Sequence, residues 1–287
     1  MSGISSISTV KNYIEKYQLF PRKKWGQNFL VDGNILSKIA DSCGLDTNCY
    51  VVEIGPGLGA LTRELAACSK GVLSIEIDNR MKEPLEMVLA AYSNTRILFA
   101  DVLQVDIEAE LKRVFNLPEI PLYKVCANIP YNITTPIIFR LLETCPHMVS
   151  ATLMMQKEVA SRIMASPGGK EYGLLTLMTA YYSEIEFLMK VSHNCFYPKP
   201  EVDSSVIRLT PIKQKRVQVK DEGRLKGLLR LAFQKRRKTM LNICSEFFRR
   251  EKNEVVNVME KLGISPACRP ETLTIYEFAV LSDTFGG

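Results

Sequence analysis

From residue 50 onward, short apolar runs alternate with amphipathic stretches, a pattern typical of α/β proteins. The runs predict strands at residues 50–55, 71–78, 96–101, 123–128 and 150–156. Stretches at 58–69, 80–93 and 134–145 carry apolar residues at helical spacing and predict the connecting helices. The runs show little polar alternation, as expected when both faces of a strand are buried. The pattern therefore predicts a doubly wound, mainly parallel sheet.

The alternating region is flanked by segments of different character. An amphipathic helix is expected near the N-terminus, and residues 32–44 predict a second helix that stops at Gly44. Two further apolar runs, 184–191 and 204–211, predict an antiparallel pair that closes one edge of the sheet.

Beyond Pro211 the alternation stops. Residues 211–223 have the composition of a linker, and helical patterns follow at 225–248 and 253–264. The sequence therefore predicts two domains: an α/β domain over residues 1–211 and a small α-helical domain over residues 212–287.

Composition narrows the class of protein. A hydrophobic content of 46% and a charged content of 24% are ordinary for globular proteins. No apolar run approaches the roughly 20 residues that cross a bilayer, and the first 18 residues lack the apolar core of a signal peptide. The eight cysteines form no C-x-x-C pair and only two histidines are present, so no metal site is expected. These features predict a cytoplasmic protein with reduced thiols and no membrane partner.

The net charge of +6 is unevenly distributed. Residues 213–252 contain 14 Lys/Arg against 4 Asp/Glu, a net charge of +10 in that segment. A basic segment on a mildly acidic body suggests a polyanionic partner, whereas the alternative is a solvated helix face. Charge alone leaves both interpretations open.

Ligands of open α/β sheets bind beyond the carboxyl ends of the strands, so the residues there are candidates for a binding site. The first strand runs into Gly55-Pro56-Gly57-Leu58-Gly59, where glycine allows close approach of a ligand to the backbone. The G-x-G-x-G spacing differs from the G-x-G-x-x-G of dinucleotide sites. Taken alone, this turn could also be purely structural.

Acidic residues follow the next two strands. Glu76 lies 21 residues after Gly55, where a carboxylate typically accepts the hydroxyls of a ribose. Asp101 ends the third strand and could accept a hydrogen bond from an adenine amino group. Each acid could equally be a helix cap, but the combination with the glycine turn favours an adenosine-containing cofactor.

The fourth strand ends in Asn128-Ile129-Pro130-Tyr131. The Asn128 side-chain oxygen and a backbone carbonyl could both accept from one exocyclic amine, and Tyr131 could stack on the ring that bears it. Such an arrangement fits a base flipped out of a nucleic acid. The alternative is a capped turn with a core tyrosine, followed by a helix with Thr134 or Thr135 as N-cap.

Together these stretches resemble the ribosomal RNA adenine dimethyltransferases, a family of methyltransferases with a Rossmann-like fold that use S-adenosylmethionine. The matching segments, in order, are KKWGQNFL, VVEIGPGLGALT, SIEID, FADVL, NIPYNITTPI, LMMQKEVASRI, CFYPKPEVDSSVIRL and AFQKRRKTMLNI. The resemblance implies transfer of methyl groups to the N6 amines of two adjacent adenosines in the 3'-terminal hairpin loop of 16S rRNA. It also implies a pre-30S ribosomal particle as partner, S-adenosylhomocysteine as the product of the cofactor, no metal, and a monomer.

The resemblance also assigns roles to particular residues of this chain. The expected cofactor-binding residues are Gln27, Asn28, Leu30, Gly55, Gly57, Glu76, Ile77, Asp101, Val102 and Asn128. The expected catalytic residues are Asn128, Pro130, Tyr131 and Phe196, with Phe196 as a second stacking wall opposite Tyr131. The expected RNA-binding residues are Arg22, Lys23, Lys24, Lys235, Arg236, Arg237 and Lys238.

Three other functions are weighed against this one. A 23S rRNA adenine-N6 methyltransferase of the macrolide-resistance type shares the fold and a similar NIPY motif. A non-catalytic nucleic-acid-binding relative would keep the basic segment without the reaction. The glycine spacing disfavours a nicotinamide dehydrogenase. Cys126 and Cys195 flank the NIPY and FYPKP motifs, but buried structural thiols explain them better than a covalent mechanism does.

Overall fold

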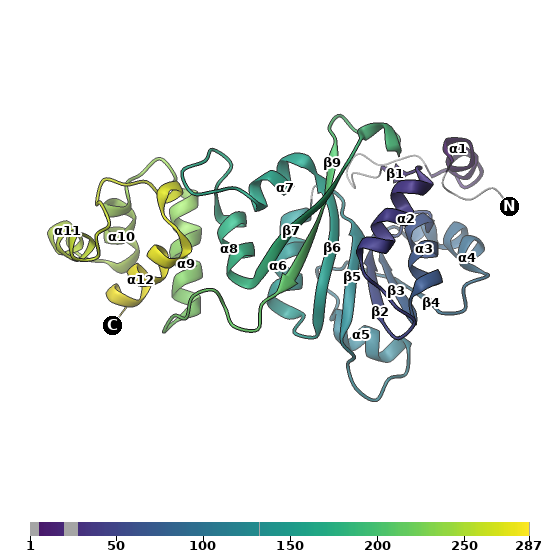
Figure 1. Cartoon of the computed structure of the whole chain (residues 1–287), viewed down its shortest axis with the longest axis horizontal. Helices are drawn as coiled ribbons and strands as arrows, with labels where there is room; N and C mark the ends of the chain where they lie inside the picture. Colours follow the sequence, from purple (N-terminus) through teal and green to yellow (C-terminus); the bar gives the residue numbers. More distant parts are fainter. Residues whose placement is uncertain (1–5, 20–27, 132, 287) are drawn as a thin grey trace. The chain divides into compact units, whose positions relative to one another are not determined.

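The computed structural model describes residues 6–19, 28–131 and 133–286 (Figure 1). The chain divides into two compact units. The first comprises residues 1–160 and 184–211, and the second comprises residues 161–183 and 212–287. The division after Pro211 coincides with the predicted domain boundary. Residues 161–183, however, were expected in the first domain and instead group with the C-terminal helices.

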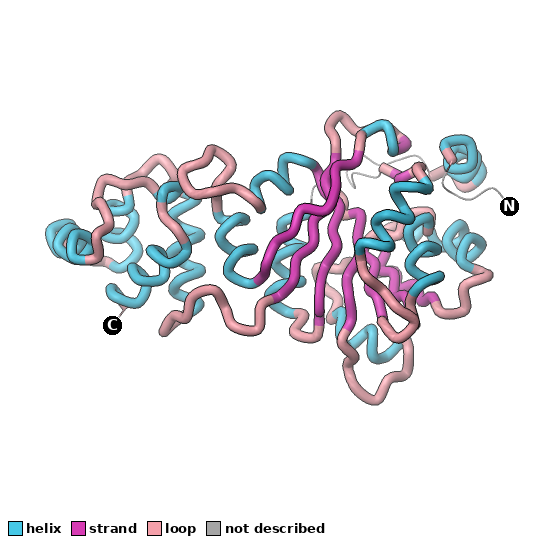
Figure 2. The backbone as a smooth tube through the Cα atoms, viewed as in Figure 1, coloured by secondary structure: helices cyan, strands magenta, loops and turns pink. Residues whose placement is uncertain are grey.

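The first unit is built on a seven-stranded sheet of order β4-β3-β2-β5-β6-β9-β7, drawn in magenta in Figure 2. The strands are β2 (Tyr50–Ile54), β3 (Gly71–Glu76), β4 (Thr95–Phe99), β5 (Tyr123–Asn128), β6 (Met148–Gln156), β7 (Ser183–Val191) and β9 (Ser204–Pro211). The pairs β2–β3, β2–β5, β3–β4 and β5–β6 are parallel, whereas β6 and β9 are antiparallel. The predicted α/β class, the mainly parallel sheet and the two late strands at one edge are therefore confirmed.

Helices connect and cover the strands of this sheet. They are α2 (Gly33–Ser42), α3 (Ala60–Cys68), α4 (Lys82–Leu89), α5 (Ile107–Val114), α6 (Thr134–Thr144) and α7 (Lys157–Ile163). Apolar residues of α2 and α3, among them Leu36 and Leu65, form one core cluster with Val51 of β2 and Cys126 of β5. Helix α6 lies on the other side of the sheet from α2 and α3 (Figure 1). The sheet is thus covered on both faces, which explains why the central strands β2, β3 and β5 are mostly apolar and buried.

A smaller assembly lies beside the carboxyl ends of β2 and β3. Helix α1 (Ile7–Lys16) packs Val10 and Ile14 into a core cluster with Phe29 and Leu58. The two-residue strands β1 (Phe29–Leu30) and β8 (Phe196–Tyr197) pair antiparallel, with Leu30 opposite Phe196. The predicted N-terminal helix is therefore present, and it forms part of the wall around the strand ends.

The second unit is helical. It contains α8 (Leu174–Tyr182), α9 (Glu222–Gln234), α10 (Met240–Phe248), α11 (Lys252–Lys261) and α12 (Ile275–Phe285). Its core includes Tyr172, whose hydroxyl donates to the Leu273 carbonyl at 2.9 Å, and Phe278, which is completely buried. Tyr172 comes from the segment that precedes the last strands of the sheet, so this unit is assembled from two separate parts of the chain.

Two details of the sequence prediction were wrong. The expected helix over residues 225–248 is divided by a turn at 235–238, where the Lys238 N–H donates to the Lys235 carbonyl at 2.8 Å. The segment contains no glycine or proline at this turn, so no signal for the end of a helix is visible there. At the start of α6, the N-cap is Ile133 and Thr134 is already the first helical residue, with its hydroxyl donating to the Pro130 carbonyl at 3.3 Å instead of capping the helix.

Candidate active site

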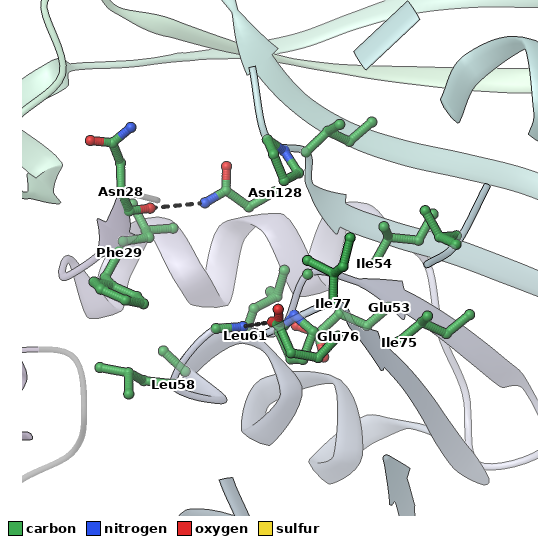
Figure 3. A pocket seen from close by; sticks show the side chains of 18 of the residues that line it. Asn28, Phe29, Glu53, Ile54, Leu58, Leu61, Ile75, Glu76, Ile77 and Asn128 are labelled. Carbon is green, nitrogen blue, oxygen red and sulfur yellow. Dashed lines mark hydrogen bonds between the residues drawn. The ribbon is translucent and has the colours of Figure 1, made fainter. Parts of the chain in front are cut away.

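A cavity of about 330 Å³ opens at the carboxyl ends of β2, β3 and β5. Its lining includes Asn28, Leu30, Gly55, Gly57, Glu76, Ile77, Asp101, Val102, Asn128, Pro130 and Tyr131. The structure therefore brings together every described residue that was predicted to hold the cofactor. Of the predicted catalytic residues, Asn128, Pro130 and Tyr131 lie in the same lining. Figure 3 shows the side chains of Asn28, Glu53, Glu76 and Asn128 around this cavity. Gln27 lies outside the described residues.

The glycine turn after β2 approaches the cavity with its backbone. Gly55 and Gly57 have φ values of 72° and 55°, which favour glycine over other residues. A Cβ atom at Gly57 would also lie 3.2 Å from the ring of Phe29. The turn directs the Gly57 N–H to Glu76 Oε2 at 3.2 Å. The glycines thus leave room for a ligand and hold the neighbouring carboxylate in place.

Glu76 ends β3 and is 5% exposed. Its Oε1 accepts from the Asp78 N–H at 2.8 Å, so each carboxylate oxygen has one backbone donor. A carboxylate offers about four acceptor positions, which leaves two for the hydroxyls of a ribose. Burial raises the pKa of Glu76 to about 7, even though hydrogen bonds from backbone N–H groups favour its charged form.

Glu53 is a site residue that the sequence prediction missed. It lies in the middle of β2, is 1% exposed and lines the same cavity. Its Oε2 accepts from the Thr62 hydroxyl on α3 at 2.6 Å and from the Ser74 hydroxyl on β3 at 2.8 Å. Burial raises the pKa of Glu53 to about 7. The signal was visible in the sequence, because an acidic residue is rare inside an apolar strand.

The loop after β4 forms the far side of the cavity. Asp101 Oδ1 accepts from the Leu103 N–H at 2.9 Å, which turns the loop so that both Asp101 and Val102 face the cavity. Arg140 of α6 donates from Nη2 to the Val105 carbonyl at 2.5 Å and so anchors the end of this loop. Ile77, the residue after β3, lies at the cavity wall and is 44% exposed, which offers an apolar surface to a purine ring.

Asn128 occupies the end of β5 beside this wall. Its Nδ2 donates to the Asn28 carbonyl at 3.4 Å, as Figure 3 shows. This orientation leaves Oδ1 as the free acceptor of the amide. The Pro130 carbonyl already accepts from the Ile133 N–H at 3.2 Å and from the Thr134 hydroxyl. Among the described residues no donor faces the Ile129 carbonyl, so it is the better second acceptor for an amine than Pro130.

Tyr131 also lines the cavity and is half-buried. Its hydroxyl lies 2.9 Å from Ser204 Oγ, and burial raises its pKa. Phe196 does not meet the predicted role of second stacking wall. Its ring is 3% exposed and belongs to the core cluster behind Leu30, because on strand β8 its side chain points to the interior. Phe196 is not among the residues that line the cavity.

The predicted RNA-binding residues fall into two groups. Arg22, Lys23 and Lys24 lie outside the described residues. Lys235 pairs with Glu246, and Arg236 contacts Glu271 at 3.6 Å and donates to the Lys170 carbonyl at 2.9 Å. Arg237 and Lys238 are exposed in the turn, with no ion pair to any described residue.

The chemistry of the lining distinguishes between kinds of ligand. Within the described residues, the cavity wall carries the three carboxylates Glu53, Glu76 and Asp101 and no basic side chain. This set suits a ligand with hydroxyls, an amino group and positive charge, such as S-adenosylmethionine, rather than a pyrophosphate. The described residues also contain no cluster of three His, Cys, Asp or Glu side chains that could hold a metal ion. The cysteines are free, and none of the described helices is long and apolar enough to cross a membrane.

The sheet order, the glycine turn and the acidic residues after β3 and β4 define a methyltransferase of the Rossmann-like class that uses S-adenosylmethionine. Residues 20–281 match the family model described as ribosomal RNA adenine dimethylase. The chain belongs to this family.

Relatives and solved structures agree with this assignment. The chain is 43% identical to the ribosomal RNA small subunit methyltransferase A of Moorella thermoacetica over 99% of both chains. It is 42% identical to the protein of that name from Geobacillus thermodenitrificans over 98% of this chain and 96% of the relative. A dimethyladenosine transferase from Plasmodium falciparum is 27% identical with a TM-score of 0.70, covering 86% of this chain and 94% of that structure. The 23S rRNA methyltransferase ErmE is 27% identical with a TM-score of 0.65, covering 90% of this chain and 100% of that structure.

Proposed function

We propose that this enzyme transfers methyl groups from S-adenosylmethionine to the N6 amines of two adjacent adenosines in the 3'-terminal hairpin loop of 16S rRNA. One observation carries the proposal. The amide oxygen of Asn128 and the carbonyl of Ile129 are both available as acceptors at the edge of the cofactor cavity, and the ring of Tyr131 stands beside them. The name shared by the relatives from Moorella thermoacetica and Geobacillus thermodenitrificans supports the small-subunit substrate.

The chain's own residues prepare the amine. An adenine amine is a poor nucleophile because its lone pair is delocalised into the ring. Two hydrogen bonds, to Asn128 Oδ1 and to the Ile129 carbonyl, hold the nitrogen toward tetrahedral geometry and localise the lone pair. Tyr131 stacks on the ring and fixes its plane, which base–aromatic contacts stabilise by about 1–3 kcal/mol. Alignment of the two reactants accounts for the rest of the acceleration.

S-adenosylmethionine supplies, when bound, a methyl group on a sulfonium and leaves as S-adenosylhomocysteine. Glu76 would accept the ribose hydroxyls, Ile77 would pack on the adenine, and Asp101 with Val102 would hold its amino edge. No strong base is required, because the methylated amine releases a proton readily to water. After one transfer the amine retains one N–H, so a second transfer can follow.

The decisive experiment measures transfer of tritiated methyl groups to small-subunit particles that lack this modification, followed by nucleoside analysis. N6,N6-dimethyladenosine is the expected product. Label found only in another nucleoside, or absent, would refute the proposal. Metal chelation should leave the activity unchanged.

A specific observation favours a second candidate, because the fold also resembles a 23S rRNA methyltransferase. Primer extension on both ribosomal RNAs distinguishes the two substrates, since a dimethylated adenine stops the polymerase. A non-catalytic, RNA-binding relative would bind no cofactor, which calorimetry with S-adenosylmethionine tests.

The remaining partners follow from the substrate. The proposed substrate is 16S rRNA within a pre-30S particle in the cytoplasm, and the enzyme acts as a monomer. The C-terminal segment of residues 212–287 would contact RNA phosphates, and Arg237 and Lys238 are its best candidates because no described carboxylate forms an ion pair with them. Lys235 and Arg236 contribute less, since both are already engaged by the protein.

A further inference from the structure

Tyr131 is attached to the rest of the site at two points. Its backbone lies in the loop between β5 and α6, and its hydroxyl lies 2.9 Å from Ser204 Oγ. The ring is half-buried between these points. A phenol held at both ends keeps one χ1 rotamer and therefore one ring position, whereas a phenol held only by its backbone can swing to another χ1 rotamer.

Ser204 is a rigid partner for this hydroxyl. It is 1% exposed and is the first residue of β9, in antiparallel register with Gln156 at the end of β6. The neighbouring Asp203 carbonyl accepts from the Lys157 N–H at 3.0 Å, and its carboxylate accepts from the His193 N–H at 2.9 Å. The backbone on both sides of Ser204 is therefore fixed before any substrate arrives.

We propose that Ser204 is a positioning residue for methyl transfer, which holds the ring of Tyr131 in one position so that the target adenine stacks with its amine at Asn128 and Ile129. This inference rests on the proposed function. Ser204 touches neither cofactor nor base in this role and acts only through the Tyr131 hydroxyl. The burial that raises the pKa of Tyr131 also keeps the phenol neutral and able to donate.

The neighbouring Ser205 provides a matched control. It is 3% exposed on the same strand, in register with Met155 of β6, and the structure records no hydrogen bond from it to Tyr131. Ser204→Ala and Ser205→Ala each remove one buried Oγ atom, so the two variants are chemically equivalent truncations. Only Ser204→Ala should disturb the ring.

The test is a double-mutant cycle on methyl transfer to small-subunit particles, with the variants Ser204→Ala, Tyr131→Phe, the double variant and Ser205→Ala. Loss of one hydrogen bond predicts that kcat falls about threefold to tenfold in each single variant of the pair. The double variant should be no slower than either single one, because both changes delete the same bond. Cofactor affinity by calorimetry should be unchanged, and Ser205→Ala should retain the wild-type kcat.

The outcomes are distinguishable from a failure of the proposed function. If the wild-type enzyme methylates no adenosine, the proposed function fails, and this inference with it. The positioning role is wrong if the wild type is active but Ser204→Ala and Ser205→Ala have the same kcat. It is also wrong if the kcat losses of Ser204→Ala and Tyr131→Phe multiply in the double variant. Should Ser204→Ala fail to fold, Tyr131→Phe deletes the same bond without a cavity, and a normal kcat for it overturns the inference.

Discussion

Cofactor binding should depend on pH through Glu76. Its carboxylate must be ionised to accept two ribose hydroxyls in addition to the N–H groups of Gly57 and Asp78. Burial raises its pKa to about 7, so protonation competes with binding near neutral pH. The affinity for S-adenosylmethionine should therefore weaken as the pH falls.

The size of the effect follows from the ionised fraction. With a pKa of about 7, about nine tenths of Glu76 is ionised at pH 8 and about one tenth at pH 6. If only the ionised form binds fully, Kd rises about tenfold between these two values. Glu76→Gln removes the charge-assisted acceptors, which contribute about 1.5–3 kcal/mol each, and should weaken binding at least about tenfold at pH 8.

Isothermal titration calorimetry of S-adenosylmethionine between pH 5.5 and 8.5 measures both effects. The Glu76→Gln variant should lose the pH dependence, whereas Glu53→Gln should retain it, although Glu53 has a similarly raised pKa. A wild-type Kd that is flat across this range would refute the reasoning. So would a pH dependence that disappears with Glu53→Gln and persists with Glu76→Gln.

Three further predictions concern stability, catalysis and RNA binding. Because the folded-state pKa of Glu53 is raised, its contribution to stability is present below about pH 4.5 and is lost as the pH rises through about 7. Glu53→Gln should therefore raise the free energy of unfolding of the cofactor-free protein by on the order of 3 kcal/mol at pH 8 and by little at pH 4. Urea denaturation at the two pH values measures this difference, and an equal gain at both would contradict it. Asn128→Ala should lower kcat about 100-fold while KM changes little, so a near-normal kcat in steady-state assays would remove Asn128 from the mechanism. Replacing both Arg237 and Lys238 by Gln should weaken RNA binding and make the slope of log K, the association constant, against log salt concentration shallower by about 1.5. Filter-binding assays at several salt concentrations measure this slope, and an unchanged slope would exclude the two residues as phosphate contacts.

Much of the cofactor cavity could be predicted from the sequence for a topological reason. In a parallel sheet the carboxyl ends of neighbouring strands converge, so a glycine turn, Glu76, Asp101 and Asn128 at four such ends had to meet. The position of each residue along its strand was sufficient for this inference. No side-chain orientation had to be known.

Orientation and long-range pairing are what the sequence did not reveal. Phe196 is on a two-residue strand, and its burial depends on which face of that strand packs behind Leu30. Glu53 was overlooked because its partners, Thr62 and Ser74, come from two other elements. Likewise, the grouping of residues 161–183 with the C-terminal helices depends on tertiary contacts such as that of Tyr172 with Leu273.

The position of β9 has a consequence for the order in which the sheet is completed during synthesis of the chain. This strand is the last of the sheet in the chain, yet it lies between β6 and β7. A nascent chain that has emerged only as far as β7 contains every residue of the cofactor cavity but has a gap beside β6. Ser204 arrives with the strand that fills the gap, so its hydrogen bond with Tyr131 forms only after β9, which ends at residue 211, has left the ribosome. The sheet beside the cofactor cavity is thus completed late in the synthesis of the chain.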